Sequence, residues 1–147
     1  CGCKFEYSKH FLRIIPNEIL NSVNITTDPF PGFPTDLQAP FMALMATANG
    51  TSQIKETIFE NRMHHVKELN RMGAKITVTN NIANVIGVKK LQGREVIGSD
   101  LRATAALAIA GLSANGKTIV KGLEHLERGY ENFPEKFQEI GALIFKK

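Results

Sequence analysis

Residues 35–50 read TDLQAPFMALMATANG, and residues 99–116 read SDLRATAALAIAGLSANG. Each stretch has an aspartate at its second position, continues as a mostly apolar run and ends at a glycine, the residue that commonly terminates helices. A helix that is apolar nearly all round is expected to be buried. The first stretch also has the Thr-x-x-Gln form of a capping box, with Thr35 as the cap. The two stretches therefore predict buried central helices over residues 35–48 and 101–112.

The similarity of the two stretches extends along the chain and indicates a duplicated unit. Arg62 recurs as Arg128, 66 residues later, and Gly73-Ala74-Lys75-Ile76 recurs as Gly141-Ala142-Leu143-Ile144, 68 residues later. Gly2-Cys3-Lys4-Phe5 is a further partial copy, 71 residues before the sequence at Gly73. The order of these matches at nearly constant spacing, rather than any one identity, supports the duplication.

This repeat divides the chain into the end of one unit with a linker (residues 1–35), a whole unit (36–99) and a further unit (100–147). In each unit a short strand is expected after the buried helix, and then an amphipathic helix. The expected strands cover residues 51–55, 75–79, 82–88 and 117–121, with a late strand after Gly141. The expected apolar stripes of the amphipathic helices are Val66, Leu69 and Met72, and Phe133, Phe137 and Ile140. The fold class that follows is α/β (α+β), with buried helices surrounded by strands and outer helices, and a two-layer sandwich with a single sheet is the alternative.

Composition is that of an ordinary globular chain and excludes several functions. The 147 residues are 43% hydrophobic and 22% charged, with a formal net charge of +4. Basic residues are dispersed and aromatic residues are few, so nucleic-acid binding is not expected. The apolar runs fall short of the ~20 residues that a membrane-spanning helix needs, and no leader opens the chain. Neither membrane insertion nor export is therefore expected.

The cysteines carry little structural information. Cys1 and Cys3 are the only two in the chain, so a disulfide framework is not expected, and a reducing, cytoplasmic location fits best. His10, His64 and His65 show no ligand spacing with the two thiols, and no metal site is expected.

Charged residues recur at the ends of the predicted elements, where functional side chains commonly lie. Asp36 and Asp100 begin the two buried helices, where a carboxylate can simply cap free N–H groups. Arg62, Arg102 and Arg128 are harder to explain, because a cation in the first turn of a helix, as at Arg102, is unfavourable. We expect the three guanidiniums to converge on a small phosphorylated or carboxylated anion. Separate surface ion pairs are the alternative, with Glu60, Glu127 or Glu131.

Five motifs follow one another along nearly the whole chain. They are Phe33-Pro34-Thr35-Asp36-x-Gln38-Ala39, Phe59-Glu60-Asn61-Arg62, His65-Val66-x-Glu68-Leu69-x-Arg71-Met72-Gly73-Ala74, Asp100-Leu101-Arg102-Ala103 and Arg128-Gly129-Tyr130-Glu131. In this order they resemble the C-terminal domain of the bacterial UDP-N-acetylglucosamine enolpyruvyl transferases, a branch of the enolpyruvyl transferase (EPSP synthase) family. The shikimate-pathway branch shares the fold but is less similar in these motifs.

The resemblance implies an inside-out α/β barrel of repeated units, with helices inside and sheets outside, of which this chain is an incomplete domain. It also implies an enzyme. The reaction that the resemblance implies is transfer of enolpyruvate from phosphoenolpyruvate to the 3-hydroxyl of UDP-N-acetylglucosamine, with release of phosphate, in the first committed step of peptidoglycan synthesis. No metal and no organic cofactor are expected for this reaction.

The matching motifs also imply roles for individual residues. Asp36 corresponds to the aspartate that contacts the sugar 3-hydroxyl and is the candidate general base. Ile58 corresponds to an aliphatic residue that lines the nucleotide-sugar site through its backbone. Arg102 and Arg128 correspond to arginines that face phosphoenolpyruvate, where positive charge would stabilise its carboxylate and the departing phosphate. Asp100 corresponds to an aspartate near the reacting carbons, with a role in proton handling or domain closure.

The resemblance adds Arg62 and Glu60 to the same wall of the site and places the remaining machinery in an N-terminal domain. That machinery comprises a catalytic cysteine or aspartate on a mobile loop, a lysine–asparagine pair and further phosphate-binding arginines. The isolated chain is therefore expected to be inactive and to have an exposed sheet edge. A function of another class, a non-catalytic repeat module that binds an anionic ligand, is the alternative.

Overall fold

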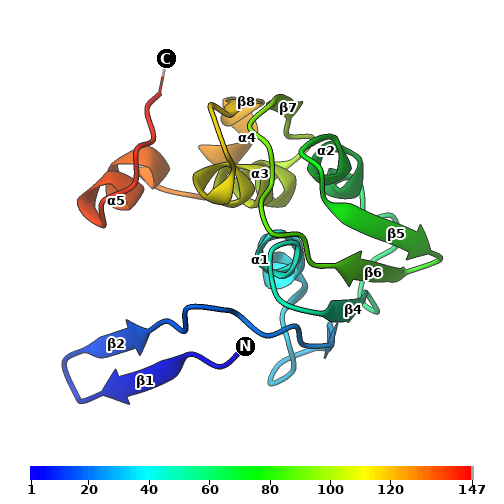
Figure 1. Cartoon of the computed structure of the whole chain (residues 1–147), viewed down its shortest axis with the longest axis horizontal. Coiled ribbons are helices and arrows are strands. Elements are labelled where there is room, and N and C mark those ends of the chain that lie inside the picture. The colour runs from blue at the N-terminus through cyan, green and yellow to red at the C-terminus, as the bar shows by residue number, and fades with distance from the viewer. Residues whose placement is uncertain (147) are drawn as a thin grey trace.

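The structure, a computed structural model, describes residues 1–146. Figure 1 shows two central helices with strands and shorter helices arranged around them. The helices are η1 (Thr35–Leu37), α1 (Gln38–Met45), α2 (His65–Arg71), α3 (Leu101–Ser113), α4 (Leu123–Leu126) and α5 (Phe133–Glu139). The strands are β1 (Lys4–Tyr7), β2 (Leu12–Ile15), β3 (Ile25–Thr26), β4 (Thr51–Lys55), β5 (Lys75–Thr79), β6 (Ile82–Ile86), β7 (Glu95–Ile97) and β8 (Ile119–Lys121).

The strands form three separate sheets. β1 and β2 make a hairpin, the order β3-β4-β6-β5 makes a four-stranded sheet, and β7 pairs with β8. This confirms the mixed α/β class with buried helices and excludes the alternative with a single sheet. Within residues 1–146 the sheets do not close into a barrel.

The core lies where α1 packs against α3. Met42 and Met45 on α1 and Leu107 on α3 are at most 1% exposed. Burial of these large apolar side chains is the main stabilisation available to a chain of this size. The predicted buried helices are thus confirmed.

The first central helix begins differently from the prediction. Thr35 does not cap it, because α1 begins only at Gln38, after the 3-10 turn η1, and the Thr35 hydroxyl donates to Glu56 at 2.9 Å instead. The helix also ends earlier than predicted, at Met45. Thr47 and Ala48 continue it only as a tighter turn, in which each N–H bonds the carbonyl three residues earlier.

The same pattern of main-chain hydrogen bonds occurs beside each of the two central helices. Asn49 donates from its N–H to the Leu20 carbonyl and accepts from the Ser22 N–H, and Asn115 makes the same pair of bonds with Leu91 and Gly93. The strands flanking each helix are also alike, since β3 runs parallel to β4 and β7 runs parallel to β8. This agreement supports a repeat, while the unit boundaries stay a prediction.

Three glycines that the sequence aligns share one unusual backbone conformation. Gly2, Gly73 and Gly141 have φ of +91°, +90° and +94°, a region that residues with a Cβ rarely occupy. Gly73 and Gly141 follow the ends of α2 and α5, as the C-cap prediction requires.

The second unit departs from the prediction after β8. Phe133 is buried in a small cluster with Ala105, Ala108 and Leu126, so α5 packs against helices rather than over a sheet. Ile140, expected in the buried stripe, is 79% exposed because α5 ends at Glu139 and its last turn extends beyond the cluster. The strand expected after Gly141 does not form in the described part of the chain.

The hairpin of β1 and β2 extends away from the core (Figure 1). All of its strand residues are exposed, including Phe5, Tyr7, Leu12 and Ile14. In the equivalent pair β5 and β6, by contrast, Ile76, Ala83 and Val85 are buried. β1 and β2 also pair only with each other in the described residues, so each has an unpaired edge, as expected from the sequence.

Candidate functional site

Asp36 and Arg102 form an ion pair where the two central helices begin. Asp36 lies in η1, directly before α1, and its side chain is 65% exposed, while Arg102 lies in the first turn of α3. Arg102 Nε donates to Asp36 Oδ1 at 2.5 Å. The packing of α1 on α3 therefore brings together an acid and a guanidinium that the sequence singled out separately. An anion beside Arg102 also offsets the unfavourable placement of a cation at a helix start.

Asp100 caps α3. Its Oδ1 accepts from the N–H groups of Arg102 at 2.9 Å and Ala103 at 3.0 Å, and Ser99 donates to Oδ2 at 3.2 Å. Partial burial raises the pKa of the Asp100 carboxyl, but these hydrogen bonds outweigh it, so that the pKa is lowered from its usual value. The capping explanation of this aspartate is therefore correct, and it directs the Asp100 carboxylate to the backbone of the turn that carries Arg102.

Tyr130 lies in the electrostatic field of the Asp36–Arg102 pair. Burial raises the pKa of its phenol, the charge of Asp36 raises it further, and Arg102 opposes both. The loop that holds Tyr130 lies against the start of α3, since a Cβ built on Gly129 would come within 3.2 Å of Leu101 Cδ1. The sequence identified this loop through Arg128 and did not single out the phenol.

Arg128 is near this group but is not joined to it. Within residues 1–146, no ion pair links Arg128 to Asp36 or to an acidic neighbour, and Glu127 pairs with Lys146 and Glu131 with Lys136. Arg128 and Tyr130 line the same cavity of about 580 Å³. The alternative of separate surface ion pairs therefore does not describe this arginine.

Arg62 lies over an aromatic ring. Its guanidinium carbon is 4.2 Å from the centre of the Phe59 ring, a cation–π contact. Its Nη1 is buried and has no hydrogen-bond partner in the described residues. The ion pair with Glu60 that the alternative required is not formed among the described residues.

Glu56 is a polar residue of this region that the sequence analysis missed. Its side chain is 2% exposed, and it accepts hydrogen bonds from Thr27, Thr35, Ile58 and Phe59. The alternation of β4, in which Ser52 and Ile54 are buried, was a signal that could have revealed it. Continued by one step of two residues, this period points Glu56 inward.

His65, at the start of α2, was also missed as part of this region. It is 3% exposed, and its Nε2 has no hydrogen-bond partner in the described residues. Burial lowers the pKa of this imidazole to about 4, with the charge of Asp100 opposing and that of His64 assisting. The ring is therefore neutral near pH 7, and His65 contributes no positive charge to the site.

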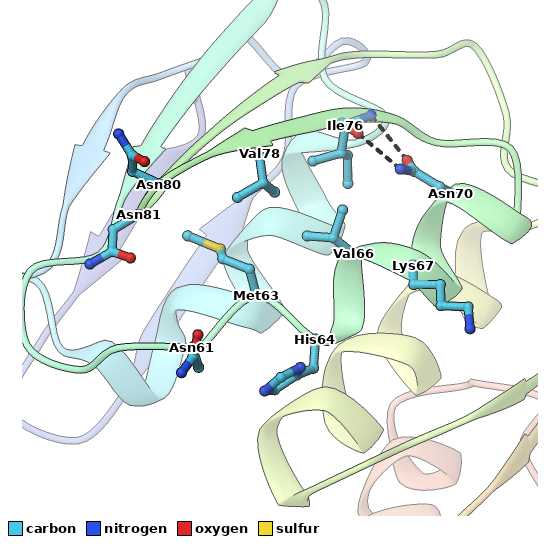
Figure 2. Close-up of a pocket in the computed structure, with 10 residues that line it drawn as sticks. All are labelled: Asn61, Met63, His64, Val66, Lys67, Asn70, Ile76, Val78, Asn80 and Asn81. Carbon is cyan, nitrogen blue, oxygen red and sulfur yellow. Dashed lines mark hydrogen bonds between the residues drawn. The ribbon is translucent and has the colours of Figure 1, made fainter.

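A second cavity, of about 580 Å³, lies between α2 and β5 (Figure 2). Asn70 joins the two elements, because its Nδ2 donates to the Ile76 carbonyl at 2.9 Å and its Oδ1 accepts from the Ile76 N–H at 3.0 Å. Asn61, Met63 and His64 lie at the other end of this cavity. None of the seven residues that the sequence assigned to the active site lines it.

Two further properties concern the described residues as a whole. Among residues 1–146, no group of three histidine, cysteine or acidic side chains is close enough to hold a metal ion. None of the helices described is both long enough and apolar enough to cross a bilayer.

Comparison with known proteins places the chain among related sequences. Residues 2–137 match the family model described as EPSP synthase (3-phosphoshikimate 1-carboxyvinyltransferase). The chain is 58% identical over 144 residues to UDP-N-acetylglucosamine 1-carboxyvinyltransferase 2 of Prochlorococcus marinus strain SARG, covering 98% of this chain and 34% of that protein. It is 57% identical over 141 residues to UDP-N-acetylglucosamine 1-carboxyvinyltransferase of Nostoc sp., covering 96% of this chain and 32% of that protein. The chain thus spans about a third of the length of these curated relatives.

Solved structures agree. The enolpyruvyl transferase NikO from Streptomyces tendae superposes with a TM-score of 0.86 at 28% identity, covering 96% of this chain and 33% of that chain. EPSP synthase from Acinetobacter baumannii superposes with a TM-score of 0.59 at 16% identity, covering 88% of this chain and 34% of that chain, and supports the fold alone.

Proposed function

The chain belongs to the EPSP synthase family of enolpyruvyl transferases, and on that premise we propose that it forms one wall of an enolpyruvyl transferase active site. The proposed reaction transfers enolpyruvate from phosphoenolpyruvate to the 3-hydroxyl of UDP-N-acetylglucosamine and releases phosphate. Relatives that carry this activity in their names, at 57–58% identity over nearly the whole chain, support the choice of acceptor. The product would enter peptidoglycan synthesis.

The observation that carries the proposal is the pairing of Asp36 with Arg102 at 2.5 Å, on an exposed edge formed by the starts of two packed helices. A carboxylate held there can accept the proton of a sugar hydroxyl, provided that the hydroxyl comes within hydrogen-bond reach. The neighbouring guanidinium can then bind an anionic co-substrate. A base and an anion-binding group side by side match the needs of a reaction between an alcohol and phosphoenolpyruvate.

In the proposed first step, the 3-hydroxyl oxygen bonds to C2 of phosphoenolpyruvate, an acidic group of the other domain gives a proton to C3, and Asp36 accepts the hydroxyl proton. This gives a tetrahedral adduct. In the second step C3 loses a proton, the double bond re-forms and the bond from C2 to the phosphate oxygen breaks. Arg102 and Arg128 would stabilise the carboxylate and the departing phosphate. Arg62 would add its unpaired Nη1 to the same wall.

In this proposal Asp100 acts chiefly by holding the first turn of α3, and with it Arg102, in place. Ile58 would line the nucleotide-sugar site through its backbone. No metal or organic cofactor takes part in the proposed steps. The two cysteines, Cys1 and Cys3, are free thiols, and a cytoplasmic location remains the proposal.

We further propose that the rest of the enzyme supplies the missing machinery, because the chain spans only about a third of its relatives. The family resemblance implies a cysteine or aspartate, a lysine–asparagine pair and further arginines on the other domain. The non-catalytic alternative is not favoured, since relatives of this high identity are named as enzymes.

The test is a phosphate-release assay on the full-length enzyme, with phosphoenolpyruvate and UDP-N-acetylglucosamine together and each alone. Phosphate is expected only when both are present, and the isolated chain is expected to release none. Absence of release by the full-length enzyme would contradict the proposed activity. Normal release by the isolated chain would contradict the proposed need for a second domain.

A further inference from the structure

Glu56 connects two loops of the site through one buried carboxylate. Its Oε1 accepts from Thr27 Oγ1 at 2.9 Å, from the Ile58 N–H at 2.9 Å and from the Phe59 N–H at 3.2 Å. Its Oε2 accepts from Thr35 Oγ1 at 2.9 Å. Oε1 thus contacts Thr27 and the turn at residues 58–59, whereas Oε2 contacts Thr35.

The contacts around Glu56 form a closed network. Thr27 accepts from the Thr57 N–H at 2.8 Å through the same Oγ1 that donates to Glu56, and Thr57 Oγ1 donates to the Thr27 carbonyl. Burial raises the pKa of the Glu56 carboxyl, but the hydrogen bonds from Ile58, Thr35, Thr27 and Phe59 outweigh it and lower the pKa below its usual value. The carboxylate is therefore ionised, and an ionised buried group requires such partners.

Both residues assigned to the acceptor sugar are tied to this network: Asp36 adjoins it, and Ile58 is part of it. Thr35 directly precedes Asp36 within the single turn of η1, and Ile58 is itself a donor to Glu56. Phe59, the other backbone donor, carries the ring on which Arg62 lies. A shift of Glu56 would move both Asp36 and the Ile58 peptide.

We propose that Glu56 is a positioning residue that sets Asp36 and the Ile58 backbone at a fixed separation and so determines how the acceptor sugar is held. This rests on the proposed function. Glu56 touches neither substrate, so its effect is exerted through Thr35 on one side and through the Ile58 peptide on the other. The separation matters because small displacements of reacting groups cost large factors in rate.

The first test replaces Thr35 in the full-length enzyme, because its half-buried side chain can change without leaving a large cavity. Thr35→Val keeps the shape and removes the donor, whereas Thr35→Ser keeps the donor. We expect Thr35→Val to lower kcat/KM for UDP-N-acetylglucosamine by about 10- to 100-fold, with the KM for phosphoenolpyruvate unchanged. Thr35→Ser should resemble the parent enzyme.

Glu56→Gln is the companion variant, because an amide can no longer accept at both positions, and the same selective loss is expected. Glu95→Gln is the control, since this exposed carboxylate on β7 pairs only with Lys121. Equal rises in the KM of both substrates, or parent-like kinetics in Thr35→Val, would overturn the proposal. A merely structural role would lower the active fraction without changing one KM alone.

Amide hydrogen exchange of Thr35→Val separates this inference from the proposed chemistry. If Glu56 couples the loops, loss of the Thr35 hydroxyl should speed exchange at the Ile58 and Phe59 amides, while the ladder between β4 and β6 stays protected. Unchanged exchange at both amides would refute the coupling whatever the reaction. Coupled exchange in an enzyme that releases no phosphate would instead remove the proposed function and leave the link between the loops.

Discussion

Arg102 Nε donates to Asp36 Oδ1 at 2.5 Å and joins residues 66 positions apart at the starts of the two central helices. Asp36 is placed by η1 and by the Thr35 contact with Glu56, whereas Arg102 is placed by the Asp100 cap of α3. The pair is therefore the point at which two independently built segments meet.

Replacing Asp36 by Asn in the full-length enzyme should separate chemistry from binding. Asparagine has nearly the same shape but cannot accept the hydroxyl proton, so we expect turnover to fall by at least about 100-fold. Binding of UDP-N-acetylglucosamine, measured by calorimetry, should largely persist. Asp28→Asn is the control, because Asp28 is an exposed carboxylate earlier in the same loop. Undiminished phosphate release by Asp36→Asn would remove the base assignment.

Asp100→Ala should destabilise the chain by about 1 kcal/mol, since the first turn of α3 loses its side-chain cap. Asp100→Asn retains an acceptor oxygen and should cost less. Because the pKa of Asp100 is lowered on folding, its stabilisation is present above the pKa of the unfolded chain and is lost as pH falls through the folded value. Urea unfolding of the two variants near pH 7 measures the difference, and equal stability of parent and Asp100→Ala would contradict the capping role.

His65 should make stability depend on pH between about 6.5 and 4. Its pKa is lowered from 6.5 to about 4 by burial, so the unfolded chain binds a proton in this range and the folded chain does not. Stability should therefore fall as pH falls, by up to about 3 kcal/mol across the range. His65→Gln should flatten this slope in urea unfolding experiments, whereas the exposed His10→Gln should not. If the stability of His65→Gln still falls with pH as in the parent, groups other than His65 cause the pH dependence.

Gly87 and Gly116 allow a comparison of two ways in which an added methyl group can destabilise the fold, by a steric clash and by an unfavourable φ. A Cβ on Gly87 would lie 1.6 Å from the Ala48 carbonyl oxygen, which belongs to the backbone and cannot move aside. We expect Gly87→Ala to cost about 3 kcal/mol or more. Gly116 has φ of +81° and no neighbouring atom within 4 Å, so Gly116→Ala should cost only about 1 kcal/mol. If the two variants unfold at the same midpoint, the contact with Ala48 can relax.

The sequence predicted the elements whose signal lies within a short window. The apolar runs at residues 35–48 and 101–112 predicted the central helices. Alternation predicted β5, and the place of residues 51–55 after the first helix predicted β4, both with the bounds observed. Gly73 and Gly141 marked helix ends because a left-handed residue is needed there. Each of these features depends on residues close together in the chain, which is why one sequence sufficed.

The sequence did not predict contacts made between distant segments. Thr35 has the spacing of a helix cap, yet its hydroxyl donates to the buried carboxylate of Glu56, 21 residues away. The same reasoning missed His65, because its burial is decided by the packing of other segments around it. Glu56 was missed because the alternation of β4 was not continued beyond Lys55. Ile140 was assigned to a buried stripe by helical spacing, but α5 ends at Glu139 and Ile140 is 79% exposed.

The bonds that Asn49 and Asn115 make beside the two central helices involve main-chain atoms only. Because these bonds do not depend on the side chains of the linked residues, substitutions at these positions can leave the bonds intact. If the two units arose by duplication, as the sequence predicts, such bonds would preserve a common backbone while the side chains at the helix starts changed.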